Sequence, residues 1–263
     1  MSDEIEAEIP VVETAGAKCT NCDAPFGEND RFCRAFGVQL VPAEDENAAY
    51  KKWNAIRQLI LFFVIEGIIC ACSFIKAFHT LGWLIFMDVT LAVMAITFVS
   101  LNWSRCSPLL KWHNFSAGRL VGYCLLAVLA SCAVGFAADW INETLFSKRE
   151  SYTLFFASYK HPILLCIIFT AIAPAIFEEL AFRVFLLGKL LVVLEKNQAV
   201  FLSAFMFGIM HMSFISLIWL IPFGLWVGFI RIRQNTMWYG SCIHFCFNFT
   251  VCISEIWQTS YHH

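Results

Sequence analysis

The chain has 263 residues, of which 59% are hydrophobic and only 14% are charged, and its formal net charge is -2. This composition is too apolar for a soluble domain of that length. The near-neutral charge, without basic runs or basic residues interleaved with aromatic ones, argues against a nucleic-acid partner. We therefore expect a polytopic integral membrane protein whose main surroundings are the lipid bilayer.

The first part of the chain, residues 1–50, is acidic and polar and is expected to form a small cytosolic region. It lacks the basic start and apolar stretch of a signal peptide, so the first hydrophobic helix is expected to direct insertion. Cys19 and Cys22 are separated by two residues and Cys33 follows, a spacing that resembles a zinc ribbon over residues 18–40. Phe36 occupies the position of the fourth cysteine. Two interpretations stay open: a structural zinc held by three thiolates or completed by a partner, and a degenerate ribbon that binds no metal.

Residues 51–263 are expected to form the membrane domain. Three apolar runs, at 56–78, 81–103 and 120–140, are long enough to cross about 30 Å of hydrocarbon. A polar stretch at 142–160 precedes a run at 161–194 that is too long for one straight span. Three more apolar segments cover residues 200–213, 214–230 and 236–257. The expected fold is an all-α membrane bundle of seven or eight transmembrane helices.

The basic residues near the first span indicate the orientation of the bundle. Lys51, Lys52 and Arg57 favour a cytoplasmic N-terminus, in a plasma or inner membrane. Arg231 and Arg233 favour a cytoplasmic loop only if residues 184–194 form a re-entrant or interfacial piece. If residues 184–194 instead help the chain to cross the membrane again, Glu178 and His211 more easily reach the same depth in the membrane. Both arrangements stay open.

Three apolar segments carry ionisable or amide side chains, which are costly inside a membrane and therefore indicate function. The first holds Glu178, Glu179 and Arg183, the second Phe207 and His211, and the third His244 and Asn248. Residues four apart share a helix face, so Arg183 is expected to pair with Glu179 and leave Glu178 free to act. The same spacing puts Phe207 beside His211 and Asn248 beside His244.

This set of groups fits hydrolysis of a peptide bond by activated water. Glu178 would take a proton from water, and a histidine would help to orient that water. His244 and Asn248 would donate hydrogen bonds to the oxyanion of the tetrahedral intermediate. Glu179 and Arg183 would hold Glu178 in place. The alternative is a purely structural role, in which these groups only join helices by hydrogen bonds.

In this order, the patterns Glu-Glu-x-x-x-Arg, Phe-x-x-x-His and His-x-x-x-Asn resemble the CPBP family of CAAX prenyl endopeptidases and bacteriocin-processing or self-immunity proteins, which includes lysostaphin-resistance-like members. The resemblance covers a protease core at about residues 160–255. It implies a glutamate-dependent, metal-independent intramembrane endopeptidase with no catalytic cofactor. Its substrate would be a peptide or protein in or at the membrane, of the prenylated CAAX type. The implied catalytic residues are Glu178, Glu179, Arg183, His211, His244 and Asn248.

Other interpretations remain open. Glu178, His211 and His244 are plausible zinc ligands, with Glu179 as the base, although no His-Glu-x-x-His helix is present. A non-catalytic membrane scaffold or bacteriocin self-immunity protein could keep the same residues for folding. Glu66 and Asp88 lie in the middle of the first two spans. We expect each to form a buried polar contact or to be a charge that faces the bundle, rather than to line a proton or substrate pathway.

Overall fold

The computed structural model describes residues 17–19, 22–26, 33, 35, 46–75, 78–113, 115–146 and 152–261. The chain divides into two compact units, Met1–Lys51 and Lys52–His263.

The N-terminal unit contains a short antiparallel pair of strands, β1 (Ala17–Lys18) and β2 (Pro25–Phe26). Between them the backbone N–H groups of Cys22 and Asp23 both donate to the carbonyl oxygen of Cys19, which closes a tight turn. Asp23 adopts the left-handed conformation with φ of 52°. Much of the expected ribbon, including Phe36, lies outside the described residues.

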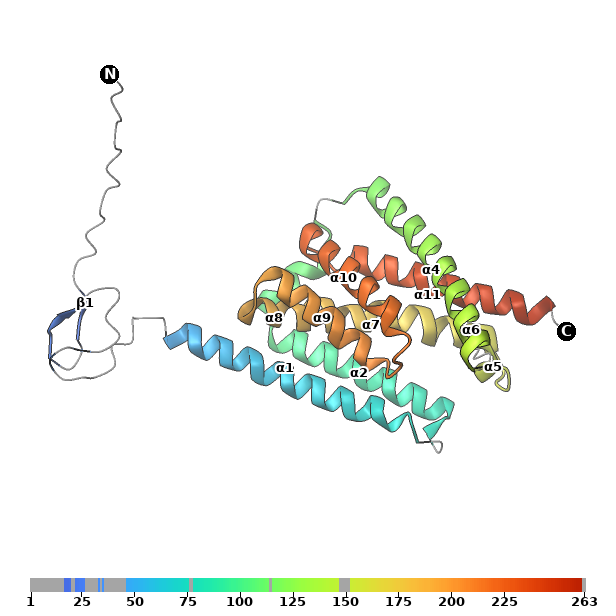
Figure 1. Ribbon diagram of the computed structural model, residues 1–263, viewed down its shortest axis with the longest axis horizontal. Helices are drawn as coiled ribbons and strands as arrows, with labels where there is room; N and C mark the ends of the chain where they lie inside the picture. The colour runs from blue at the N-terminus through green and yellow to red at the C-terminus, as the bar shows by residue number, and fades with distance from the viewer. Residues whose placement is uncertain are drawn as a thin grey trace, which may run out of the picture. The chain divides into compact units, whose positions relative to one another are not determined.

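The second unit is a bundle of long helices (Figure 1), with each apolar segment of the sequence folded as a helix. The helices outside the candidate protease core are α1 (Glu46–Cys72), α2 (Leu81–Leu101), α3 (Trp103–Cys106), the 3₁₀ turn η2 (Ser107–Leu110), α4 (Ala117–Phe146) and α5 (Tyr152–Phe156). After a long central helix, the chain continues through α9 (Lys196–Met210), α10 (Leu217–Gln234) and α11 (Trp238–Tyr261).

Within the described residues, five helices are long and apolar enough to cross a membrane. They lie at Ala48–Cys72, Leu81–Leu101, Ala117–Thr144, Pro162–Val193 and Leu217–Gln234. These helices make the chain a polytopic membrane protein. Helix α9 has 15 residues, fewer than the roughly 20 that a straight span requires, and α11 is not among the five. The number of crossings, seven or eight from the sequence, therefore stays a prediction.

The central helix is one unbroken element from Pro162 to Val193, 32 residues long. It consists of α6 (Pro162–Cys166), η3 (Ile167–Ile172), α7 (Ala173–Glu178), η4 (Glu179–Leu186) and α8 (Leu187–Val193). At 32 residues this helix is longer than the roughly 20 that a straight span requires, as expected, and residues 184–193 continue it without turning back. The stretches η3 and η4 are π-helical, and such wide turns let a helix continue past a proline such as Pro174.

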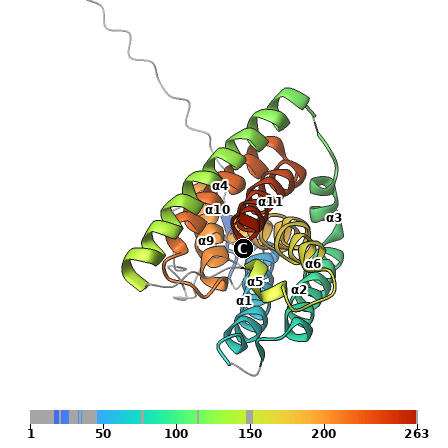
Figure 2. The ribbon, with the colours of Figure 1, turned by 90° about the vertical axis from the view of Figure 1, so that its right-hand side faces the viewer.

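The central helix packs against α2, α9 and α11, while α4 lies along α11 and α10 along α9 (Figure 2). Glycines allow the close approach of α9 and α10. A Cβ atom added to Gly224 would lie 2.9 Å from the Cβ of Ala204, a distance that real side chains do not tolerate. Small residues at such contacts are the usual way in which membrane helices pack. The bundle thereby brings the three sequence motifs to one place.

Candidate active site

The two adjacent glutamates lie at the junction of α7 and η4, where their side chains meet different surroundings. Glu179 is fully buried, and its Oε2 atom is 3.4 Å from Nε of Arg183. The i, i+4 spacing predicts this pair. Arg183 is also buried, with its Cζ atom 4.3 Å from the centroid of the Phe207 ring, a cation–π contact. The buried guanidinium is thus held by one carboxylate and one aromatic face.

His244, on α11, joins the two glutamates. Its Nδ1 atom is 3.0 Å from Oε1 of Glu179, and its Nε2 atom is 3.9 Å from Oε2 of Glu178. The imidazole is buried and lies edge-on to the rings of Phe207 and Phe223, at centroid distances of 6.0 and 5.1 Å. The aromatic rings therefore fix the plane of the imidazole, and Glu179 fixes which way it faces.

Gly240 lies one turn before His244 on α11 and makes room for the glutamate. A Cβ atom at this position would lie 2.9 Å from Oε2 of Glu179 and 2.8 Å from Cγ1 of Val227. Only glycine fits without displacing one of them. Sequence reasoning missed this residue, although its place four residues before His244 puts it on the same helix face.

Glu178 is the more accessible glutamate, with 19% of its side chain exposed. It borders a small cavity that is also lined by Asp88, Pro174 and Phe177. Its Oε2 atom makes no hydrogen bond in the described part of the chain. Asp88, expected to form a buried polar contact or to face the bundle, lines this cavity together with the candidate base.

Glu66, the other acidic residue in the middle of a predicted span, is 4% exposed. Its Oε1 atom has no hydrogen-bond partner among the residues that the structure describes. The side chain therefore faces the interior of the bundle, and no hydrogen bond to a described residue offsets the cost of burying this oxygen.

His211 caps the C-terminal end of α9 and is exposed. Its Nδ1 atom lies 3.0 Å from the carbonyl oxygen of Phe207, and its ring packs on the Phe207 ring at 4.9 Å. Among the described residues it forms no ion pair with Glu178 or Glu179. Phe207 thus connects His211, Arg183 and His244 through one ring.

Asn248 lies one turn after His244 and donates a hydrogen bond of 2.9 Å from Nδ2 to the carbonyl oxygen of Thr170 in η3. In an α-helix, this carbonyl would accept from the N–H of residue 174, which is a proline and has none. Asn248 therefore satisfies a carbonyl that Pro174 cannot. An amide NH₂ group has two donors, so one remains for a ligand.

The residues predicted to bind a structural metal also come together. The Sγ atoms of Cys19, Cys22 and Cys33 all lie within 4.8 Å of one another, and those of Cys22 and Cys33 are 3.4 Å apart. In the described part of the chain this is the one group of three or more potential ligands so close together. Three thiols at this spacing fit three corners of a tetrahedral zinc site. Glu178, His211 and His244 do not form such a group.

Comparison with known proteins gives one family match. Residues 160–250 match the family model described as type II CAAX prenyl endopeptidase Rce1-like. This segment contains the six residues of the site, and the match supports an intramembrane endopeptidase at the level of the family. Neither the curated proteins nor the solved structures contain a significant match.

Proposed function

We propose that the chain is an intramembrane endopeptidase that cleaves a membrane-associated protein of the prenylated CAAX type with water activated by Glu178. One observation carries the proposal: a single buried imidazole, His244, lies between two adjacent glutamates of which one is paired and the other faces a cavity. Carboxylates and an imidazole brought together beside a cavity are typical of catalytic sites.

The pairing with Glu179 sets the protonation of His244. An ionised carboxylate only accepts hydrogen bonds, so Nδ1 of His244 carries a hydrogen atom and donates a hydrogen bond to Glu179. The Nε2 atom then points toward Glu178 at 3.9 Å, which is too long for a direct hydrogen bond. A water molecule bridging these two groups would be held by the candidate base and oriented by the imidazole.

In the proposed reaction, Glu178 takes a proton from this water as its oxygen attacks the scissile carbonyl carbon. The resulting oxyanion accepts hydrogen bonds from the second amide proton of Asn248 and from Nε2–H of His244, which in this scheme carries a proton on each ring nitrogen throughout the reaction. Glu178 then gives its proton to the leaving nitrogen as the C–N bond breaks. The products are a new carboxylate and a new amine.

Glu179 and Arg183 are positioning residues in this scheme, because Glu179 contacts His244 and Arg183 contacts Glu179. Their negative and positive charges offset one another inside the apolar bundle. The chemistry uses side chains of the chain alone. The cysteine cluster of the N-terminal unit is proposed to hold a structural zinc.

The test is cleavage by the purified full-length protein in lipid nanodiscs. The substrates are a farnesylated CAAX peptide, the same peptide without the lipid, and an unrelated membrane-anchored peptide. In Glu178→Gln the side chain keeps its shape but can no longer accept a proton from water, so turnover is expected to fall by about 10²–10⁴-fold. Asp139→Asn on α4 is the matched acid-to-amide control and should keep wild-type turnover.

Each outcome assigns the function. Cleavage that needs Glu178 and is indifferent to a zinc chelator supports the proposal. Chelator-sensitive cleavage favours the metal alternative. Absence of cleavage of all three peptides by folded protein favours a scaffold or self-immunity role, for which the main-chain hydrogen bonds of His211 and Asn248 are the supporting observation.

A further inference from the structure

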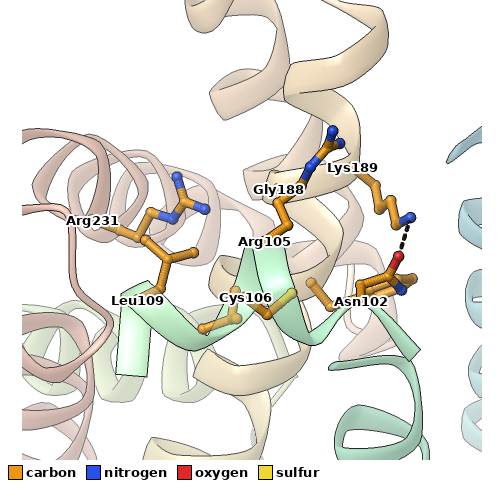
Figure 3. A pocket seen from close by; sticks show the side chains of 9 residues that line it. Asn102, Arg105, Cys106, Leu109, Gly188, Lys189 and Arg231 are labelled. Carbon is orange, nitrogen blue, oxygen red and sulfur yellow. Dashed lines mark hydrogen bonds between the residues drawn. The ribbon is translucent and has the colours of Figure 1, made fainter. Parts of the chain in front are cut away.

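A second pocket lies at the other end of η4, near the ends of three membrane helices. Its lining comes from the segment that follows α2, from the junction of η4 and α8, and from the last turns of α10. Three cationic side chains belong to this lining: Arg105, Lys189 and Arg231 (Figure 3). The candidate active-site residues are not part of it.

Two of these cations are buried. The exposed fraction is 6% for Lys189 and 7% for Arg231, whereas Arg105 is exposed. Burial of a charge costs several kcal/mol unless the charge is paired, so such cations normally face a carboxylate. Among the described residues, no carboxylate lies within ion-pair distance of any of the three.

The neutral partners leave the positive charge uncompensated. Nζ of Lys189 donates a hydrogen bond of 2.6 Å to Oδ1 of Asn102, as Figure 3 shows. The guanidinium of Arg231 makes no hydrogen bond to any described residue, and its Nε atom is buried without a partner. An unpaired, buried guanidinium that lines a pocket indicates a ligand from outside the chain.

Cys106 does not supply the missing negative charge. It lines the same pocket as Arg105, Lys189 and Arg231, and the positive charge of each favours its thiolate. Burial nevertheless raises the pKa of the Cys106 thiol, so it stays neutral near pH 7. The pocket thus combines three positive charges with no anion of its own.

We infer that this pocket binds a phosphate-type oxyanion, held by Arg105 and Arg231 through their guanidinium forks and by Lys189 as a point charge. Guanidinium groups match the oxygens of phosphate in pairs. Gly188 borders the guanidinium, because a Cβ atom there would lie 3.6 Å from Nη2 of Arg231, an ordinary van der Waals contact. The ends of membrane helices lie at the depth of lipid phosphates, so the source is a phospholipid headgroup or a soluble phosphate compound.

The experiment measures binding to delipidated wild-type protein in detergent at constant ionic strength. One arm titrates inorganic phosphate, and the other titrates short-chain phosphatidylglycerol against a short-chain diacylglycerol that lacks phosphate. The readouts are the ligand-dependent rise in melting temperature and a one-to-one adduct in native mass spectrometry. We expect saturable binding in at least one arm and none of the diacylglycerol.

Three variants decide the assignment. Arg231→Gln and Arg105→Gln each remove a charge-assisted contact and should weaken binding about tenfold or more. Arg233→Gln, two residues along α10 and exposed, should bind as the wild type does. Arg105 is exposed, so its variant keeps the test decisive if Arg231→Gln does not fold.

The two arms distinguish the source: lipid binding alone assigns a headgroup, and binding of inorganic phosphate alone assigns a soluble ligand. The inference is overturned if neither probe binds the wild type, or if Arg105→Gln binds as tightly as Arg233→Gln. Glu178→Gln should bind normally, so loss of peptidase activity leaves this result unaffected.

Discussion

His244 and Glu179, 65 positions apart in the chain, are joined by a hydrogen bond of 3.0 Å between Nδ1 and Oε1 in the interior of the bundle. Glu179 also pairs with Arg183, so one carboxylate holds two partners on two helices. Glu178, its neighbour in sequence, lies 3.9 Å from Nε2 of the same histidine, and its Oε2 atom makes no hydrogen bond in the described part of the chain. The two glutamates are therefore expected to respond differently to the same substitution.

Glu179→Gln should destabilise the protein, whereas Glu178→Gln should not. The first change leaves Arg183 buried without its counter-charge, which costs about 3–5 kcal/mol. The second acts at a side chain with no hydrogen bond from Oε2 and should change the free energy of unfolding by less than about 0.5 kcal/mol. Thermal unfolding in detergent measures both. Equal melting temperatures for the two variants would contradict the division of roles.

Gly240→Ala should lower activity through displacement of Glu179. The added methyl group overlaps both Oε2 of Glu179 and the side chain of Val227, an overlap that costs about 1–3 kcal/mol. Turnover and melting temperature are both expected to fall. Gly135→Ala on α4 is the control, because a Cβ atom there meets nothing within 4 Å. If Gly240→Ala behaves as that control does, the close approach of α11 to Glu179 is wrong.

Asn248→Ala tests whether the amide does more than join two helices. Loss of the hydrogen bond to Thr170 should cost about 1 kcal/mol of stability. Loss of an oxyanion donor should lower kcat by a further factor of about 10²–10³. The measurement is kcat per folded molecule, with the folded fraction taken from size-exclusion chromatography. A decrease that only follows the folded fraction would assign Asn248 a structural role.

The cysteine cluster should bind one zinc ion per chain. Cys33→Ser is expected to abolish the bound zinc, because Cys33 supplies one of the three thiols that the structure brings together. Acidification should release the metal, since only the thiolate is a ligand. Elemental analysis of protein purified with zinc provides the measurement, and Cys132→Ser, an exposed cysteine on α4, is the control. Wild-type protein without zinc would favour the degenerate ribbon.

Local patterns in the sequence predict much of this fold. Hydropathy locates the helices because an apolar run in a bilayer has to satisfy its own backbone. The pairing of Glu179 with Arg183 follows from helix geometry alone. The unbroken central helix could not be predicted, because the spacing of apolar residues in the sequence does not reveal where a π-helical turn occurs.

The remaining parts of the site depend on contacts between distant segments. The hydrogen bond of Asn248 to Thr170 joins residues 78 positions apart, and the fit of Gly240 against Glu179 requires the register of α11 on the central helix. Neither is encoded in a motif. The lack of a counter-charge beside Arg231 can likewise be recognised only when the residues around it in the structure are known.

The π-helical turns of η4 set the rotation about the axis of the central helix between the two glutamates and Lys189. At one end of this stretch stand the glutamates, and just beyond its other end stands Lys189. Each residue advances a helix by about 100° of rotation, so deletion of a single residue inside η4 would swing Lys189 away from Asn102 while Glu178 and Glu179 keep their direction. The length of η4, more than the identity of its apolar side chains, therefore limits which insertions and deletions this membrane protein can accept.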